Sequence, residues 1–265
     1  KIVDGEEVPD IGRLFYRGYE IHDLIDGYKA EDRFGFEEIA YLLLFGYLPD
    51  VNQLKEFSVK LIFYRSLPKN FVRDVIMKAP GEDMMNVLMR SVLTLSPYDD
   101  NANDVSLPNV LRQSMQLISL IPMISIYGYQ AYRHYECGDS LVIPQPLENG
   151  SIAENILHLL RPDSTYSDIE AKALDTALVL HMDHGGGNNS AFTTHVVTST
   201  LTDTYSAIAA ALASLKGPRH GGANLKVQQM FKDLHENVED VTDDDQIRNY
   251  LQKILAIKNF WILIT

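Results

Sequence analysis

Two short motifs combine histidine and glycine in a pattern that suits chemistry. The segment HMDHGGGNNS covers residues 181–190, and GPRHGGAN covers residues 217–224. In each, a helical stretch leads into a turn with a histidine and glycines, and an asparagine follows four residues after that histidine. A helix that begins after such a turn presents free N–H groups, which can bind an anionic ligand. Both motifs are therefore candidate sites for binding or catalysis.

His220 is the candidate catalytic residue. It lies between an alanine-rich helical stretch, residues 205–216, and a second helical stretch, residues 225–238. The positive end of the second helix's dipole disfavours an imidazolium at this place. A neutral imidazole can donate a hydrogen bond to a carbonyl oxygen as charge builds there, as in triosephosphate isomerase. The glycines around His220 permit positive φ angles or a close approach of another group to the backbone.

Other interpretations of the motifs are open at this point. His181 and His184 could be metal ligands, but one helical turn supplies two ligands at most and no third is evident. The HGGG of residues 184–187 is also found in esterase oxyanion holes, but the chain has no G-x-S-x-G nucleophile motif. The glycine run lacks the G-K-[ST] ending of a phosphate loop. Both histidines could also be packed turn residues without a chemical role. Asp183 and Asn188 or Asn189 are expected to shape the turn.

The remaining candidates have ordinary contexts. Arg17, in FYRGYE, is either a surface charge or an anion clamp if its turn points inward. Cys137 stands beside Gly138 without a partner motif, so it is only a weak candidate for a nucleophile. We assign no chemistry to the histidines in amphipathic or loop contexts, namely His22, His134, His158 and His235.

The elements that must position the motifs are mostly helices. Asp50 with Gln53 matches the capping box that opens a helix, and so does Ser167 with Glu170, before a helix over residues 171–181. FEEIAYLLLFG predicts another helix, ended by its glycine at residue 46. Thr242 is expected to begin a helix with one apolar face. Glycine and proline punctuate the first twenty residues, which predicts short strands and turns there. The sequence thus predicts a mainly α protein with short β segments at the N-terminus.

Composition excludes some classes of partner. The chain has 265 residues and a formal net charge of −13, which argues against nucleic acid and against an anionic membrane surface. The apolar stretch over residues 117–132 is shorter than the ~20 residues of a membrane span and contains Pro122, so we expect a buried, kinked core helix. A single cysteine excludes an internal disulfide and fits a reducing compartment, so we expect a cytoplasmic protein.

The segment LHMDHGGGNNSAFTTHVVTSTLTDTYSAIAAALASLKGPRHGGAN closely resembles the citrate synthase family. The upstream segments LFYRGYEIHDLI, FEEIAYLLLFGYLPD and SIAENILHLL are similar to that family too, in the same order. The resemblance covers residues 11–224 and fades after that. It implies a large multi-helix domain, residues 1–219, followed by the start of a smaller helical domain, residues 220–265, that closes on the substrates. It also implies a homodimer.

The resemblance implies a condensation of acetyl-CoA with oxaloacetate that yields citrate and free CoA. It implies neither a metal nor a resident cofactor, because the CoA thioester is a substrate. His220 matches the histidine that hydrogen-bonds the thioester oxygen, and His184 matches a histidine that binds oxaloacetate. Arg219 is either a surface charge or a contact to an anionic substrate, and we assign it to substrate binding. His195 stands where relatives often have arginine, which we interpret as structural variation.

The resemblance is incomplete. After GPxHGGAN the family continues with a third histidine, the catalytic aspartate and substrate-binding arginines, none of which this sequence matches. We expect a piece of a longer polypeptide, or else a chain that ends naturally here. The apolar NFWILIT, with Trp261, is then either buried or followed by further residues.

Two alternative functions stay open. One is 2-methylcitrate synthase, which uses propionyl-CoA, since one methylene changes discrimination by only ~1–3 kcal/mol. The other is a non-catalytic fragment that binds a dicarboxylate, which the unmatched aspartate and third histidine favour.

Overall fold

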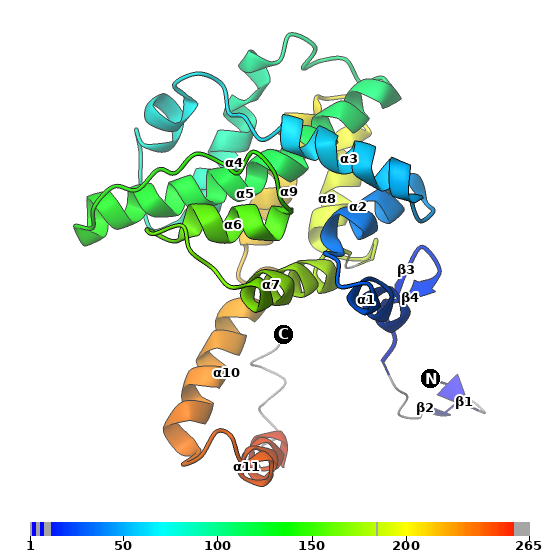
Figure 1. Ribbon diagram of the computed structural model, residues 1–265, viewed down its shortest axis with the longest axis vertical. Coiled ribbons are helices and arrows are strands. Elements are labelled where there is room, and N and C mark those ends of the chain that lie inside the picture. Colours follow the sequence, from blue (N-terminus) through cyan, green and yellow to red (C-terminus); the bar gives the residue numbers. More distant parts are fainter. Residues whose placement is uncertain (1, 4–5, 8–11, 184, 257–265) are drawn as a thin grey trace.

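The computed structural model describes residues 2–3, 6–7, 12–183 and 185–256. Four short strands form two antiparallel hairpins near the N-terminus (Figure 1). In the first hairpin β1 (Ile2–Val3) pairs with β2 (Glu6–Glu7), and in the second β3 (Phe15–Tyr16) pairs with β4 (Tyr19–Glu20). These strands confirm the short β segments predicted for this region.

Helices make up most of the remaining described chain, which confirms the mainly α prediction. In chain order they are α1 (Ile21–Ala30), α2 (Phe36–Phe45), α3 (Val51–Phe63), α4 (Met84–Thr94), α5 (Leu107–Cys137), α6 (Ile152–Leu160), α7 (Asp168–Leu180), α8 (Asn189–Thr198), α9 (Thr204–Lys216), α10 (Ala223–Asn237) and α11 (Asp244–Ala256). A π-helical turn, η1 (Val72–Ile76), precedes α4, and a 3₁₀ turn, η2 (Ser96–Tyr98), follows it.

The structure confirms three predicted helix ends, each of which is set by a capping residue close to it in the sequence. Asp50 Oδ1 accepts from Gln53 N at 2.9 Å, and Gln53 Oε1 accepts from Asp50 N at 2.9 Å, which completes the capping box of α3. Ser167 and Glu170 form the same box at the start of α7. Gly46 ends α2 with φ +86°, a left-handed conformation that glycine adopts without steric cost.

The predicted start of the last helix is wrong by two residues. Helix α11 begins at Asp244, not at Thr242. Asp243 Oδ1 accepts from Asp245 N at 2.9 Å and from Gln246 N at 3.3 Å. The aspartate therefore satisfies the free N–H groups of the first turn in place of the threonine hydroxyl.

Helix α5 lies at the centre of the main core. Leu120, Met123 and Ile124 are at most 2 % exposed, and they belong to a cluster that joins α5 to α4, α6 and α9. The predicted buried helix over residues 117–132 is therefore confirmed as part of α5, with Pro122 inside it. Among the described helices, none is both long enough and apolar enough to cross a membrane.

A second core cluster joins the β3–β4 hairpin to α1, α2 and α7. Tyr16, Tyr28 and Val179 are buried in it. Arg17, at the hairpin turn with φ +49°, donates from Nη2 to Leu43 O at 2.8 Å and from Nε to the same oxygen at 3.2 Å. Arg17 is exposed, and its guanidinium ties the hairpin to a backbone carbonyl of α2.

Two buried carboxylates hold α2, α6 and α7 together. The side chain of Asp175, on α7, accepts from Gly35 N at 2.7 Å and from Phe36 N at 3.1 Å, so it caps the start of α2. Glu37 Oε1 accepts from Ile152 N at 2.8 Å, at the first residue of α6. Burial raises the pKa of Glu37 to about 7. Helix α7, which leads into the first histidine motif, is thereby held at a defined place on α2.

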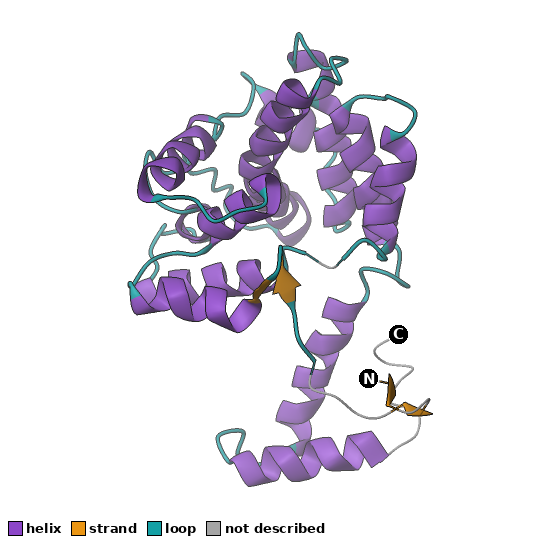
Figure 2. Cartoon of the chain, turned by 90° about the vertical axis from the view of Figure 1, so that its right-hand side faces the viewer, coloured by secondary structure: helices purple, strands orange, loops and turns teal. Residues whose placement is uncertain are grey.

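Helices α10 and α11 project away from the rest of the helices in both views of the chain (Figures 1 and 2). They contact each other near the end of α10. Leu225 and Phe231, on α10, are 65 % and 54 % exposed. The domain boundary expected between residues 219 and 220 stays a prediction. The apolar segment with Trp261 lies outside the described residues.

Candidate functional site

His220 lies half-buried in the turn that joins α9 to α10. A Cβ atom on Gly221 would lie 2.1 Å from Leu215 O, and one on Gly222 would lie 2.4 Å from Pro218 O. Neither glycine has a positive φ. The glycines after His220 are therefore needed for a close approach of backbone to backbone and not for a positive φ angle. This close approach fixes the path of the chain on the C-terminal side of His220.

The imidazole of His220 meets a hydroxyl on α8. Ser190 Oγ lies 2.7 Å from His220 Nε2 and 3.2 Å from Ala211 O. A carbonyl oxygen can only accept, and the hydroxyl has one proton. When Ser190 donates to Ala211 O, His220 must donate from Nε2. When Ser190 donates to Nε2 instead, a neutral His220 carries its proton on Nδ1. The serine therefore controls which nitrogen of His220 bears the proton.

The start of α8 positions Ser190. Asn188 caps this helix, because its Oδ1 accepts from Ala191 N at 2.8 Å. Asn188 Nδ2 also donates to Gly185 O at 3.2 Å, and Asp183 Oδ1 accepts from Gly185 N at 2.8 Å. These bonds confirm that Asp183 and Asn188 shape the turn of the first motif. The two motifs are thus connected through the first turn of α8.

The start of α9 is anchored by a buried carboxylate. Asp99 Oδ2 accepts from Arg112 Nη2 at 2.6 Å, from Gln113 Nε2 at 3.0 Å and from the Tyr205 hydroxyl at 2.8 Å. Burial by itself raises the pKa of Asp99, but the hydrogen bonds from Gln113, Arg112 and Tyr205 outweigh it and lower that pKa to about 2. An ionised Asp99 therefore holds α9, and with it the turn of His220, against α5.

The other sequence-predicted site residues fall in different places. Arg219 precedes His220 in the same turn and is exposed, and no hydrogen bond or ion pair connects its side chain to another described residue. His184 lies outside the described residues. His181 is exposed, and its Nδ1 lies 2.7 Å from Ala177 O of the preceding helical turn. His195 is exposed on α8.

The metal interpretation of the first motif depends on His184, which lies outside the described residues, so it stays a prediction. Among the described residues, no three His, Cys, Asp or Glu side chains form a group that could hold a metal ion.

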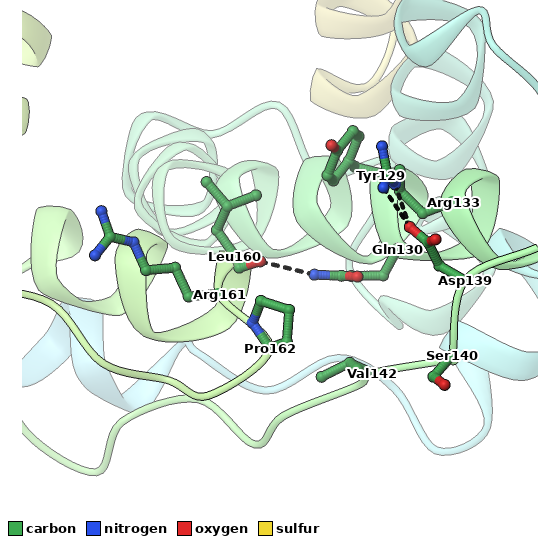
Figure 3. A pocket seen from close by; sticks show the side chains of 9 residues that line it. All are labelled: Tyr129, Gln130, Arg133, Asp139, Ser140, Val142, Leu160, Arg161 and Pro162. Atoms are coloured by element: carbon green, nitrogen blue, oxygen red, sulfur yellow. Dashed lines mark hydrogen bonds and ion pairs between the residues drawn. The ribbon is translucent and has the colours of Figure 1, made fainter. Parts of the chain in front are cut away.

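A separate pocket of about 660 Å³ lies between the C-terminal half of α5 and the loop after α6 (Figure 3). Its lining residues are Tyr129, Gln130, Arg133, Asp139, Ser140, Val142, Leu160, Arg161 and Pro162. Arg133 pairs with Asp139 inside the pocket, and Arg161 Nη2 pairs with Glu170 Oε1 at 2.5 Å. Both guanidinium groups are already neutralised and the turn of His220 does not line this pocket, so we assign no substrate to it.

Sequence reasoning missed Ser190. Its only signal is its place: it is the last residue of the first histidine motif, two residues after the capping asparagine of α8. Nothing in the local sequence identifies His220 as its partner, since the two residues are 30 positions apart.

Comparison with known proteins gives a consistent result. The family model for the citrate synthase C-terminal domain matches residues 2–262. Citrate synthase from Haloferax volcanii is 36 % identical over 88 % of this chain, which spans 59 % of that relative's length. The 2-methylcitrate synthase from Shewanella oneidensis is 30 % identical over 85 % of this chain, which spans 56 % of that relative.

Solved structures agree with the sequence matches. Citrate synthase from Pyrobaculum aerophilum has a TM-score of 0.72 and 31 % identity over 88 % of this chain and 58 % of that one. The ternary complex of Thermoplasma acidophilum citrate synthase with carboxymethyl coenzyme A and oxaloacetate has a TM-score of 0.72 and 26 % identity, over 93 % of this chain and 60 % of that one. Together with the two histidine motifs, these matches establish that the chain belongs to the citrate synthase family.

Proposed function

We propose that this chain supplies part of the active site of an enzyme that condenses acetyl-CoA with oxaloacetate to citrate and CoA. The observation that carries the proposal is the Ser190–His220 hydrogen bond at a turn whose glycines admit no side chain. Membership of the citrate synthase family supports it. The chain spans only 59 % of the length of the Haloferax volcanii relative. We therefore propose, and do not infer from the family alone, the activity, substrates and partners of the whole protein.

His220 acts as the electrophile in this reaction. The Ser190 hydroxyl donates to Nε2, the shorter of its two contacts, so that Nδ1 carries the proton. Nδ1–H then donates to the thioester oxygen while a base removes a proton from the acetyl methyl group. The methyl carbon forms a bond to the keto carbon of oxaloacetate while the keto C=O opens and its oxygen takes up a proton, and water then cleaves the thioester to release CoA. The proposal assigns the base to no residue of this chain.

The substrate-binding residues follow from the two motifs. His184 binds oxaloacetate, and Arg219 contacts an anionic group of a substrate with its exposed guanidinium. The reaction needs no metal and no resident cofactor, because the CoA thioester is itself a substrate. A cytoplasmic location goes with the single cysteine of the sequence.

A 2-methylcitrate synthase is the alternative that the comparisons favour. Relatives of that activity from Corynebacterium glutamicum are 32 % and 30 % identical to this chain. The difference lies in one methylene of the acyl group, which changes discrimination by about 1–3 kcal/mol. The ratio of kcat/KM for acetyl-CoA and propionyl-CoA, measured with oxaloacetate, separates the two activities.

The deciding experiment measures oxaloacetate-dependent release of thiol from acetyl-CoA by the purified protein. His220→Ala should lower kcat about 10²–10³-fold, as the loss of one oxyanion-stabilising donor does. His235→Ala, an exposed histidine on α10, is the matched control and should keep the wild-type rate. Wild-type protein that releases no thiol, yet binds oxaloacetate in calorimetry, would support the non-catalytic dicarboxylate-binding alternative instead.

The homodimer is also part of this proposal. Phe192 and Val196 lie one turn apart on α8 and are 63 % and 50 % exposed, so this helix offers an apolar face to a second copy. Light scattering coupled to size exclusion should give twice the chain mass for the wild type. Val196→Asp should shift the mass towards that of one chain, and a monomeric wild type contradicts the dimer.

A further inference from the structure

The hydroxyl of Tyr16 lies at the junction between α7 and the loop of the first histidine motif. Tyr16 comes from β3 and is completely buried. Its hydroxyl donates to Val179 O at 2.8 Å, near the end of α7, and accepts from Asp183 N at 3.4 Å, at the start of the loop. These partners lie 163 and 167 positions away in the chain. One side chain of the N-terminal hairpin therefore connects two successive elements near the site.

A series of hydrogen bonds continues from Asp183 to His220. Asp183 Oδ1 accepts from Gly185 N, and Gly185 O accepts from Asn188 Nδ2. Asn188 caps α8, the helix that carries Ser190. Ser190 Oγ then meets Nε2 of His220. Each step is a contact between described residues, so a displacement of the Asp183 backbone is passed to the serine through the cap of α8.

Tyrosine is suited to this place because its hydroxyl donates and accepts at once. Val179 O offers only an acceptor, and Asp183 N offers only a donor, so one hydroxyl satisfies both. Burial raises the pKa of Tyr16, which keeps the proton on the hydroxyl. Since Tyr16 is completely buried, removal of its oxygen leaves both backbone groups without this partner.

We propose that Tyr16 is a positioning residue for the catalytic histidine: its hydroxyl holds the backbone at Asp183 and, through the cap of α8, the Ser190–His220 pair. The kinetic part of this inference rests on the proposed function. The structural part does not, because it concerns the order of the loop and of the first turn of α8.

The test compares Tyr16→Phe with Tyr28→Phe. Both tyrosines are buried in the same cluster, and each substitution removes one hydroxyl. The Tyr28 hydroxyl donates to Thr176 Oγ1 at 3.4 Å, within the body of α7 and away from the loop, which makes it a matched control. Tyr16→Phe should lower the midpoint of thermal unfolding more than Tyr28→Phe, because the Tyr16 hydroxyl bonds two backbone groups, so exchange and kinetics are compared well below both midpoints.

Two readouts separate positioning from stability. Hydrogen exchange of the amides of residues 183 and 185–191 should be about tenfold faster in Tyr16→Phe than in the wild type, and unchanged in Tyr28→Phe. In thiol release, Tyr16→Phe should lower kcat about tenfold with the KM for acetyl-CoA within about twofold, since small misplacements of a reacting group reduce the rate steeply. Equal exchange and equal kcat in the two variants would overturn the inference.

The role of Tyr16 can also be tested if the wild type is inactive or if Tyr16→Phe does not fold. If the wild type releases no thiol, the proposed function fails, and the exchange result alone supports or overturns the role of Tyr16. If Tyr16→Phe does not fold, exchange of the wild type in rising denaturant is decisive. The amide of Asp183 should then open together with the β3–β4 hairpin, and opening independent of the hairpin would overturn the inference.

Discussion

The Ser190 hydroxyl and the His220 imidazole meet at 2.7 Å, although they belong to separate histidine–glycine motifs. One residue lies in the first turn of α8, and the other lies in the turn before α10. The contact unites the motifs into one site, and it ties the tautomer of a neutral imidazole to a neighbouring hydroxyl. The first prediction follows from this relationship.

Ser190→Ala should lower kcat about 10–100-fold, because the imidazole loses the partner that sets its tautomer, which costs ~1–3 kcal/mol. The KM for oxaloacetate should change little, since the serine acts through His220. Steady-state thiol release measures both values. Ser199→Ala, at the other end of α8, is the control, because its hydroxyl bonds only Val196 O among the described residues. A kcat for Ser190→Ala equal to that of the control would contradict the role of Ser190.

Arg219→Gln should raise the KM for oxaloacetate about tenfold, the effect of losing ~1.4 kcal/mol of binding free energy. The thermal midpoint should stay constant, because the Arg219 side chain is exposed and bonds no other described residue. Arg248→Gln removes an exposed guanidinium on α11 and serves as the control. An unchanged KM in Arg219→Gln would make this arginine a surface charge.

Glu37 should make stability depend on pH. Burial raises its pKa from 4.5 to about 7, with a further rise from Asp175 and an opposing effect of Arg65. Between these two pH values the unfolded chain loses the proton while the folded chain keeps it. The contribution of Glu37 to the free energy of unfolding therefore falls as pH rises from 4.5 to 7, and it is constant above that.

Glu37→Gln should remove this dependence. The free energy of unfolding of the wild type should fall by up to about 3 kcal/mol more than that of the variant when the pH rises from 4.5 to 8. Urea unfolding of both proteins at pH 4.5 and at pH 8 measures this difference. Glu56→Gln, an exposed residue of α3, should show no such change. A constant difference between wild type and Glu37→Gln across this range would sink the prediction.

Asp99→Asn should destabilise the protein by about 2 kcal/mol at pH 7. The pKa of Asp99 is lowered to about 2 from 3.8, so its ionised form stabilises the fold above pH 3.8 and loses this effect as pH falls through 2. Denaturant unfolding at pH 7 and at pH 2 should therefore show a smaller deficit at the lower pH. Asp100→Asn, the exposed neighbour, is the control. A deficit of equal size at both pH values would exclude the ionised carboxylate as the cause.

Local chemistry was predictable from the sequence, and some of the site was predictable with it. Partners within four residues form the capping boxes of Asp50 and Ser167 and the glycine end of α2. The residues next to them in the sequence are therefore enough to identify them. The same applies to the turn bonds of Asp183 and Asn188. Arg17 shows the limit, because its partner in the described chain is the backbone carbonyl of Leu43, 26 positions away.

The sequence by itself determined the helical class of the protein, the buried character of α5, and the two motifs that mark the family. Only the tertiary structure decided that Ser190 faces His220, that Asp175 caps α2 from α7, and that Tyr16 bridges α7 to the loop. The physical reason is that hydrogen bonds need partners within about 3 Å and in the right direction. Between segments distant in the chain, that geometry is set by how whole helices pack, which no local pattern of residues encodes.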